Sequence, residues 1–214
     1  MTDQKILSPK QRRQRNRDEM IDAIVLTARQ IMREQGVAAL NLNEIARALG
    51  MQTPSLYEYF ANKMALYDTL FLVGTREFRA MMARVEEGRT LAGWDKAEAY
   101  MTAYLEWSIA NPELFRLLFE RHVPGFEPSE AAMAEMYAAL EEGRRQLADS
   151  LAAMGLDPGI SPAQAMDIFI AIQHGITALH LANNPDLPIG QGRFGGLIPL
   201  VIDMMKTAWK KSDV

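Results

Sequence analysis

A chain of 214 residues is long enough to bury a substantial core, either as one all-helical domain or as a small domain joined to a larger one. It contains no cysteine, which excludes disulfides, thiolate zinc sites, iron–sulfur clusters and a cysteine nucleophile, and which fits a reducing cytoplasm. The formal net charge is −4, yet residues 1–63 carry 10 Lys and Arg against 7 Asp and Glu, so the positive end is the N-terminal end.

The pattern of apolar residues predicts an all-α protein of about nine helices. Apolar residues recur every three or four positions, and no segment sustains the period of two that marks a strand. The N-terminus lacks the apolar run of a secretory signal. The longest apolar stretch, residues 165–182, contains Gln173, His174 and His180, which would be costly in lipid. We therefore expect a buried helix of a cytoplasmic protein and no membrane partner.

The first predicted helix covers about residues 18–34 and is closed by Gly36. Residues 1–17 precede it, and we expect them to form a flexible basic arm. The basic residues of this arm are Lys10, Arg12, Arg13, Arg15 and Arg17.

A second helix is predicted from Asn41 to Gly50, and a third from Thr53 to about residue 59 or 60. The Asn41 side chain can cap the free N–H groups of the second helix while Glu44 reaches back, as in a capping box. Pro54 suits the first turn of the third helix, where its missing N–H costs nothing.

The spacing of these two helices indicates a helix-turn-helix. Ala46 is small where the helices must approach closely, and Gly50 can adopt the left-handed conformation of a sharp turn. The shared apolar seam would consist of Ile45, Leu49, Met51, Leu56 and Tyr59. Short polar side chains at the start of the third helix point away from that seam and would read bases in the major groove: Gln52, Thr53, Ser55 and Glu58. Phosphate contacts are expected from Tyr57, Tyr59 and Lys63.

The complete predicted DNA-binding set is Asn43, Gln52, Thr53, Pro54, Ser55, Tyr57, Tyr59 and Lys63. Any two amphipathic helices joined at a glycine can mimic this pattern, so spacing alone leaves an ordinary helical core as an alternative. Residues 14–70, however, resemble the DNA-binding domain of the TetR family of regulators. The matching positions are Gly36, Asn41, Ile45, Ala46, Leu49, Gly50, Leu56, Tyr57, Phe60, Lys63 and Leu66. Asn41 and Ala61 depart from the usual residues of that family but keep their local roles.

Six further helices are predicted, over residues 62–87, 94–110, 112–121, 129–154, 161–183 and 194–211, with Pro- and Gly-rich loops at 122–128 and 183–192. The predicted organisation is an arm (1–17), a three-helix DNA-binding domain (18–66) and a C-terminal helical bundle (67–214).

The family resemblance implies that the C-terminal bundle binds a ligand and dimerises, with the last two helices of each subunit forming a four-helix interface. A twofold dimer would present two recognition helices to a palindromic site in double-stranded operator DNA. The apolar residues assigned to this interface are Ile168, Ile172, Ile176, Leu179, Leu197, Val201, Met204, Met205 and Ala208.

The segment 112–128, together with His174 and Gly175, resembles the C-terminal domain of a TetR subgroup named for its Trp, His and Gly, although no Trp stands beside that pair here. The residues that could line a cavity for an unknown small-molecule effector are Phe115, Phe119, His122, Phe126, Tyr137, Phe169 and His174. Plain core packing is the alternative for each of them. No metal spacing surrounds His174 or His180, so we expect neither a metal nor a cofactor.

The expected function is that of a homodimeric repressor released from a palindromic operator by a small apolar or amphipathic inducer. Activation instead of repression stays open. An α-helical enzyme and a DNA-bound adaptor without ligand are the rival classes, but the sequence has no Gly-rich phosphate loop, nucleophile elbow or H-E-x-x-H motif.

Overall fold

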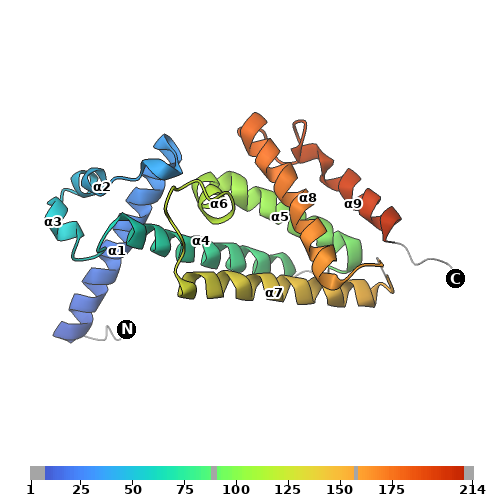
Figure 1. Cartoon of the computed structure of the whole chain (residues 1–214), viewed down its shortest axis with the longest axis horizontal. Coiled ribbons are helices and arrows are strands. Elements are labelled where there is room, and N and C mark those ends of the chain that lie inside the picture. The colour runs from blue at the N-terminus through green and yellow to red at the C-terminus, as the bar shows by residue number, and fades with distance from the viewer. Residues whose placement is uncertain (1–7, 88–90, 157–158, 210–214) are drawn as a thin grey trace, which may run out of the picture.

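The computed structural model describes residues 8–87, 91–156 and 159–209, and within these ranges the chain forms nine α-helices, two 3-10 turns and no strand. The all-α prediction is confirmed. Helices α1 to α3 lie at one end of an elongated molecule, α4 runs from them alongside α5 and α7, and α8 and α9 lie toward the other end (Figure 1). The helices are α1 Pro9–Gln35, α2 Leu42–Ala48, α3 Thr53–Leu56, α4 Lys63–Glu86, α5 Gly93–Ala110, α6 Pro112–Phe119, α7 Glu130–Ala153, α8 Pro162–Asn183 and α9 Ile198–Ala208.

Several helices begin at a capping side chain or carry a proline in the first turn. The Asn62 side chain accepts a hydrogen bond from the backbone N–H of Ala65 at 3.0 Å and begins α4. Ser161 and Gln164 form a reciprocal capping box at the start of α8. Pro112 and Pro162 occupy the first turns of α6 and α8, where a missing N–H is tolerated.

The prediction of a flexible basic arm over residues 1–17 is wrong for residues 9–17, which belong to α1. The helix starts nine residues early because Ser8 and Gln11 form a capping box: the Gln11 backbone N–H donates to Ser8 Oγ at 3.3 Å, and the Ser8 backbone N–H donates to Gln11 Oε1 at 2.9 Å. Pro9 then stands at the first helical position, and the Arg and Gln residues that follow are good helix formers. Residues 1–7 lie outside the described ranges.

The N-terminal helices share one apolar core with α6. Ile24 of α1, Leu56 of α3 and Leu66 of α4 are fully buried in this core together with Leu114 and Phe115 of α6. α4 runs through the predicted domain boundary at residue 66. The two ends of the molecule are therefore packed together and share a long helix.

An ion-pair network also joins α1 to the C-terminal bundle. The Glu113 carboxylate of α6 has no exposed surface and accepts hydrogen bonds from Arg29 Nε at 2.9 Å, Arg33 Nε at 3.1 Å and Arg33 NH2 at 3.0 Å. Arg29 also donates to Glu77 of α4 at 2.8 Å and to Asn111 Oδ1 at 2.7 Å. These bonds satisfy the buried carboxylate and fix α1 against α4 and α6.

A second core lies between α5, α7, α8 and α9, with Met101, Leu105, Phe169 and Ile202 among its buried members. α8 is long and apolar enough to span a membrane by composition, which is weak evidence because the core helix of a soluble protein meets the same criteria. It also buries Gln173, Thr177 and His180 in the bundle.

Candidate DNA-binding and ligand-binding sites

The turn between α2 and α3 has the geometry predicted for a helix-turn-helix. Gly50 has a φ of 66°, which is in the left-handed region, and the Met51 backbone N–H donates to the Ala46 carbonyl at 2.8 Å. The Asn41 side chain caps α2 by accepting from the Asn43 backbone N–H at 2.9 Å. The predicted return contact of Glu44 is not formed, because its carboxylate accepts from Gln35 Nε2 at 2.8 Å instead.

All eight residues predicted to bind DNA keep part of their surface accessible. Asn43, Gln52, Pro54 and Tyr57 are exposed, whereas Thr53, Ser55, Tyr59 and Lys63 are half-buried. α3 ends at Leu56, and a hydrogen-bonded turn continues to Phe60, so the third helix is shorter than expected. Tyr57 follows this helix with 51% of its surface exposed.

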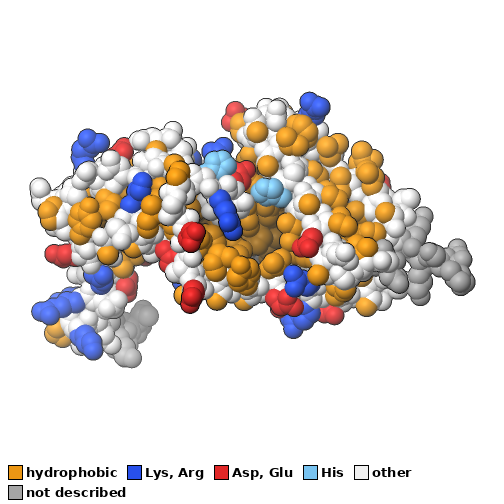
Figure 2. All heavy atoms as spheres, viewed as in Figure 1, with side chains coloured by type: hydrophobic (Ala, Val, Ile, Leu, Met, Phe, Trp, Pro, Cys, Tyr) orange, Lys and Arg blue, Asp and Glu red, His pale blue; other side chains and the backbone are white. Residues whose placement is uncertain are grey.

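The basic start of α1 lies against the end of the helix-turn-helix. Arg17 NH2 donates to the Glu58 carbonyl at 3.1 Å, and its guanidinium carbon lies 5.0 Å from the centre of the Tyr59 ring. Basic side chains gather on the N-terminal end of α1 in Figure 2. The exposed basic residues on this helical extension are Lys10, Arg12, Arg13, Arg15 and Arg17. The chain thus places a positive helix beside the candidate recognition helix.

The C-terminal bundle encloses a cavity of about 730 Å³ between α4, α5, α7 and α8. Figure 2 shows a hollow with hydrophobic walls near the middle of the drawn face, beside α8. Aromatic side chains and methionines supply much of the wall. They are Phe78, Trp94, Tyr100, Tyr104, Phe119, Phe169 and Trp209 with Met82, Met136, Met154, Met166 and Met205.

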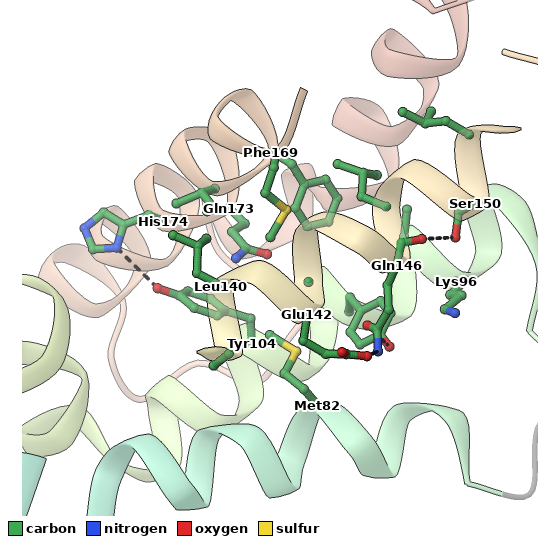
Figure 3. A pocket seen from close by; sticks show the side chains of 18 of the residues that line it. Met82, Lys96, Tyr104, Leu140, Glu142, Gln146, Ser150, Phe169, Gln173 and His174 are labelled. Atoms are coloured by element: carbon green, nitrogen blue, oxygen red, sulfur yellow. Dashed lines mark hydrogen bonds between the residues drawn. The ribbon is translucent and has the colours of Figure 1, made fainter. Parts of the chain in front are cut away.

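Three polar side chains face the cavity from α5 and α8 (Figure 3). The Tyr104 hydroxyl lies 3.3 Å from His174 Nδ1. Burial raises the pKa of Tyr104 well above its ordinary value of 10, so the hydroxyl keeps its proton and can donate it to Nδ1. Gln173 is 6% exposed, and its Oε1 has no hydrogen-bond partner among the described residues.

Other polar groups in the cavity wall bond to one another. Gln146 Nε2 donates to Glu142 Oε1 at 2.9 Å, and the Tyr100 hydroxyl donates to Gln146 Oε1 at 3.2 Å. Arg145 NH2 donates to Glu142 Oε2 at 2.6 Å, and this hydrogen bond lowers the pKa of Glu142.

Of the seven residues predicted to line a cavity, Phe119, Phe169 and His174 do so. Phe115 lies in the core behind the wall, with its ring stacked on His174 at 5.2 Å between centres. Phe126 packs against Tyr67 and Phe71 near the N-terminal core.

The other two residues of that set, His122 and Tyr137, are exposed and do not line this cavity. Tyr104 and Gln173 line the cavity but were not among the residues predicted to do so. A buried amide beside a histidine on an otherwise apolar helix was the available signal for Gln173. No group of three or more His, Asp or Glu residues in the described ranges is arranged to hold a metal ion.

One face of α8 and α9 carries exposed apolar side chains (Figure 2). Ile168 and Leu179 of α8 are exposed, and Ile172 is half-buried. On α9, Met204 is 63% exposed and lies on the same face as Leu197, Val201 and Ala208.

Two residues assigned to this face, Ile176 and Met205, are instead buried within the protomer. Met205 packs in the core with Ile198, Ile202 and Trp209. Leu200, which was not among the residues predicted for the interface, is 57% exposed. α9 is apolar on two sides, and its contacts with α5 determine which side faces inward.

Two protein families match this chain, one over its N-terminal helices and the other over its C-terminal bundle. Residues 24–70 match the family described as bacterial regulatory proteins, tetR family, and residues 97–193 match the tetracycline repressor-like C-terminal domain. The Trp-His-Gly subgroup suggested by the sequence is not confirmed. The HTH-type transcriptional regulator Rv1816 of Mycobacterium tuberculosis is 29% identical over 116 residues, which are 53% of this chain and 50% of that protein. The chain thus spans about half the length of the curated relatives it matches.

Solved structures share the whole fold at low sequence identity. A Rhodococcus protein of unknown function superposes with a TM-score of 0.75 at 21% identity, covering 90% of this chain and 96% of that one. FadR of Bacillus subtilis, solved in complex with stearoyl-CoA, has a TM-score of 0.65 at 14% identity, covering 87% and 98%. The chain therefore belongs to the TetR family of bacterial regulatory proteins, with the family's N-terminal domain followed by a tetracycline repressor-like C-terminal domain.

Proposed function

We propose that this protein is a homodimeric, ligand-responsive transcription repressor of the cytoplasm, released from a palindromic operator by a small apolar or amphipathic inducer. The observation that carries the proposal is a large apolar cavity whose wall includes α6, the helix that also holds α1 of the helix-turn-helix domain. The protein would thus combine DNA binding and ligand sensing in one chain.

DNA binding rests on the surface of α3 and its surroundings. Gln52 and Ser55 offer side chains that can donate to and accept from base edges in the major groove. Tyr57 and Lys63 flank the same helix and are suited to phosphate oxygens. The basic start of α1 adds phosphate contacts that carry no sequence information, so this part of the affinity should fall with salt.

Dimerisation rests on the exposed apolar face of α8 and α9. This face presents Leu200 and Met204, each more than half exposed, on a helix whose other side is already buried. A contiguous apolar face of this kind is what a partner subunit would cover. A twofold contact between two copies would place two recognition helices on the same side of a DNA duplex.

Ligand response would use α6 as the mobile element. Phe119, at the C-terminal end of α6, contributes to the cavity wall. Glu113, near the N-terminal end of α6, binds Arg29 and Arg33 of α1. A ligand that prefers a shifted α6 would therefore change the orientation of α1. Moving the population from mostly DNA-competent to mostly incompetent requires a preference of about 5 kcal/mol for one state.

The alternatives receive less support. Membership in a family of regulatory proteins argues against the enzyme. A DNA-bound adaptor without ligand would not need the cavity. FadR of Bacillus subtilis, a protein of this fold, was solved in complex with stearoyl-CoA, which supports a ligand-binding role for the corresponding bundle here.

Selection from a library of random DNA duplexes tests the DNA-binding proposal. We expect the wild-type protein to enrich one palindrome, and the double variant Gln52→Ala/Ser55→Ala to lose that enrichment while keeping salt-sensitive binding to random DNA. Gln191→Ala, at an exposed loop position far along the chain, is the matched control and should select the same palindrome. Binding to all duplexes alike by the wild type would contradict sequence-specific regulation.

A further inference from the structure

We propose that the cavity binds an uncharged ligand with an apolar body and a single hydroxyl or amide group, and that Gln173 recognises that group. This inference rests on the ligand-sensing function proposed above and adds the chemical class of the ligand.

The first observation is the state of Gln173. Gln173 is only 6% exposed, and its side chain projects into the cavity from α8 (Figure 3). Its Oε1 has no hydrogen-bond partner within the described ranges. A buried amide oxygen without a partner is unfavourable, because the hydrogen bonds it accepted from water in the unfolded chain are lost. A ligand that supplies the missing bond removes this penalty.

The second observation is the character of the neighbours of Gln173. Phe169, Ile170 and Ile176 lie within one turn of Gln173 on α8, and all three are apolar. His174 is bonded to Tyr104 through Nδ1, and that hydroxyl is protonated. An ionised ligand group placed beside Gln173 would lose its hydration, and these neighbours on α8 would offer it no opposite charge.

The charged groups of the cavity wall occupy other positions. Glu142 is engaged by Arg145 and Gln146. Lys96 lies at the end of the cavity near Ser150, away from His174, with its ammonium 5.9 Å from the centre of the Tyr100 ring (Figure 3). A ligand anchored by a carboxylate would place its charge at Lys96 or at Arg79 of α4, the two cationic residues of the wall, and so the two modes of binding are experimentally distinct.

A hydroxyl or an amide matches Gln173 because each such group both donates and accepts, as the glutamine amide does. The remaining wall suits an apolar body. Five methionines among the lining residues can adjust their conformations to the shape of that body, and the aromatic rings supply large apolar surfaces.

Calorimetric titration with decan-1-ol and decanoate separates these possibilities, because the two probes share a chain and differ in head-group charge. We expect the wild type to bind decan-1-ol about tenfold more tightly than decanoate. Gln173→Leu should weaken binding of the alcohol about fivefold, the effect of losing one hydrogen bond, and should leave the weak binding of decanoate unchanged.

Gln146→Leu is the matched control, since it makes the same change at a second lining glutamine whose amide is already hydrogen-bonded within the protein. It should preserve the preference for the alcohol. Circular dichroism establishes that each variant is folded. A merely structural role of Gln173 would weaken binding of both probes equally and would overturn the assignment.

Tighter binding of decanoate, with loss of that binding in Lys96→Met or in Arg79→Met, would also overturn the proposal in favour of an anionic ligand. Failure of both probes to bind a folded protein that still selects its DNA would overturn it too, while leaving the DNA-binding function standing. If decan-1-ol binds through Gln173 but leaves the DNA complex intact, the ligand assignment holds and the proposed release mechanism fails.

Discussion

Replacement of Glu113 by Gln should destabilise the protein strongly, because it removes the charge at the centre of the α1–α6 network. The carboxylate is fully buried and accepts from two guanidinium groups, of which that of Arg29 is only 16% exposed. Removing one partner of a buried ion pair costs 3–5 kcal/mol in comparable cases. Because Gln keeps one acceptor oxygen and the side chain of Arg33 is half-exposed, we expect a loss of about 3 kcal/mol.

Urea unfolding followed by circular dichroism, at equal protein concentrations, measures this loss. For a chain of this size the same change lowers the melting temperature by about 6–12 °C. Glu135→Gln is the matched control, because it makes the same change in a carboxylate that also accepts hydrogen bonds from a guanidinium group. Glu135 pairs with a single arginine, Arg76, and this pair lies on the surface. Surface pairs contribute little, so its transition should not move measurably. Equal effects of the two variants, or a more stable Glu113→Gln, would refute the reasoning.

Four further outcomes are expected from substitutions of individual residues. Burial raises the pKa of Tyr67 to about 12, so the folded state resists ionisation of this side chain. The free energy of unfolding should therefore fall as the pH rises from 10 towards 12, and it should fall less steeply in Tyr67→Phe. Urea midpoints measured across that pH range test this expectation. Met204→Asp should convert the dimer to monomer in sedimentation experiments without unfolding it, whereas a persistent dimer would place the interface elsewhere. Ile202→Ala, in the core beneath that face, should cost about 3 kcal/mol on unfolding, and an unchanged midpoint would contradict its burial. Lys63→Ala should reduce the slope of log affinity for DNA against log salt by about one, and an unchanged slope would exclude a phosphate contact.

Local sequence rules predicted most of the helices, because their start signals act within four residues. Asn62 and Ser161 cap α4 and α8 through hydrogen bonds to residues three positions away. The same rule was available for Ser8 and Gln11, yet the density of positive charge in residues 10–17 suggested a frayed arm. A capping box followed by good helix formers outweighed that repulsion.

Features that depend on tertiary contacts could not be predicted in the same way. Periodicity showed that α9 is apolar, but both of its sides are. Met205, predicted for the dimer interface, is therefore buried against the protomer once α5 covers one side, and Leu200 is exposed on the other. The Glu113 network joins residues 80 and 84 positions apart, and nothing local indicates that pairing. The cavity wall likewise combines residues of α4 to α9, and no local pattern indicates that Tyr104 of α5 lies in it.

In the proposed complex, two copies of this chain place their α3 helices in adjacent major grooves of one duplex. Hydroxyl-radical footprinting on the palindrome recovered by selection tests this most directly. We expect two protected half-sites with centres about 10 base pairs, or a multiple of that, apart, and loss of both protections in Met204→Asp. A single protected half-site, or uniform protection along the duplex, would contradict the claim.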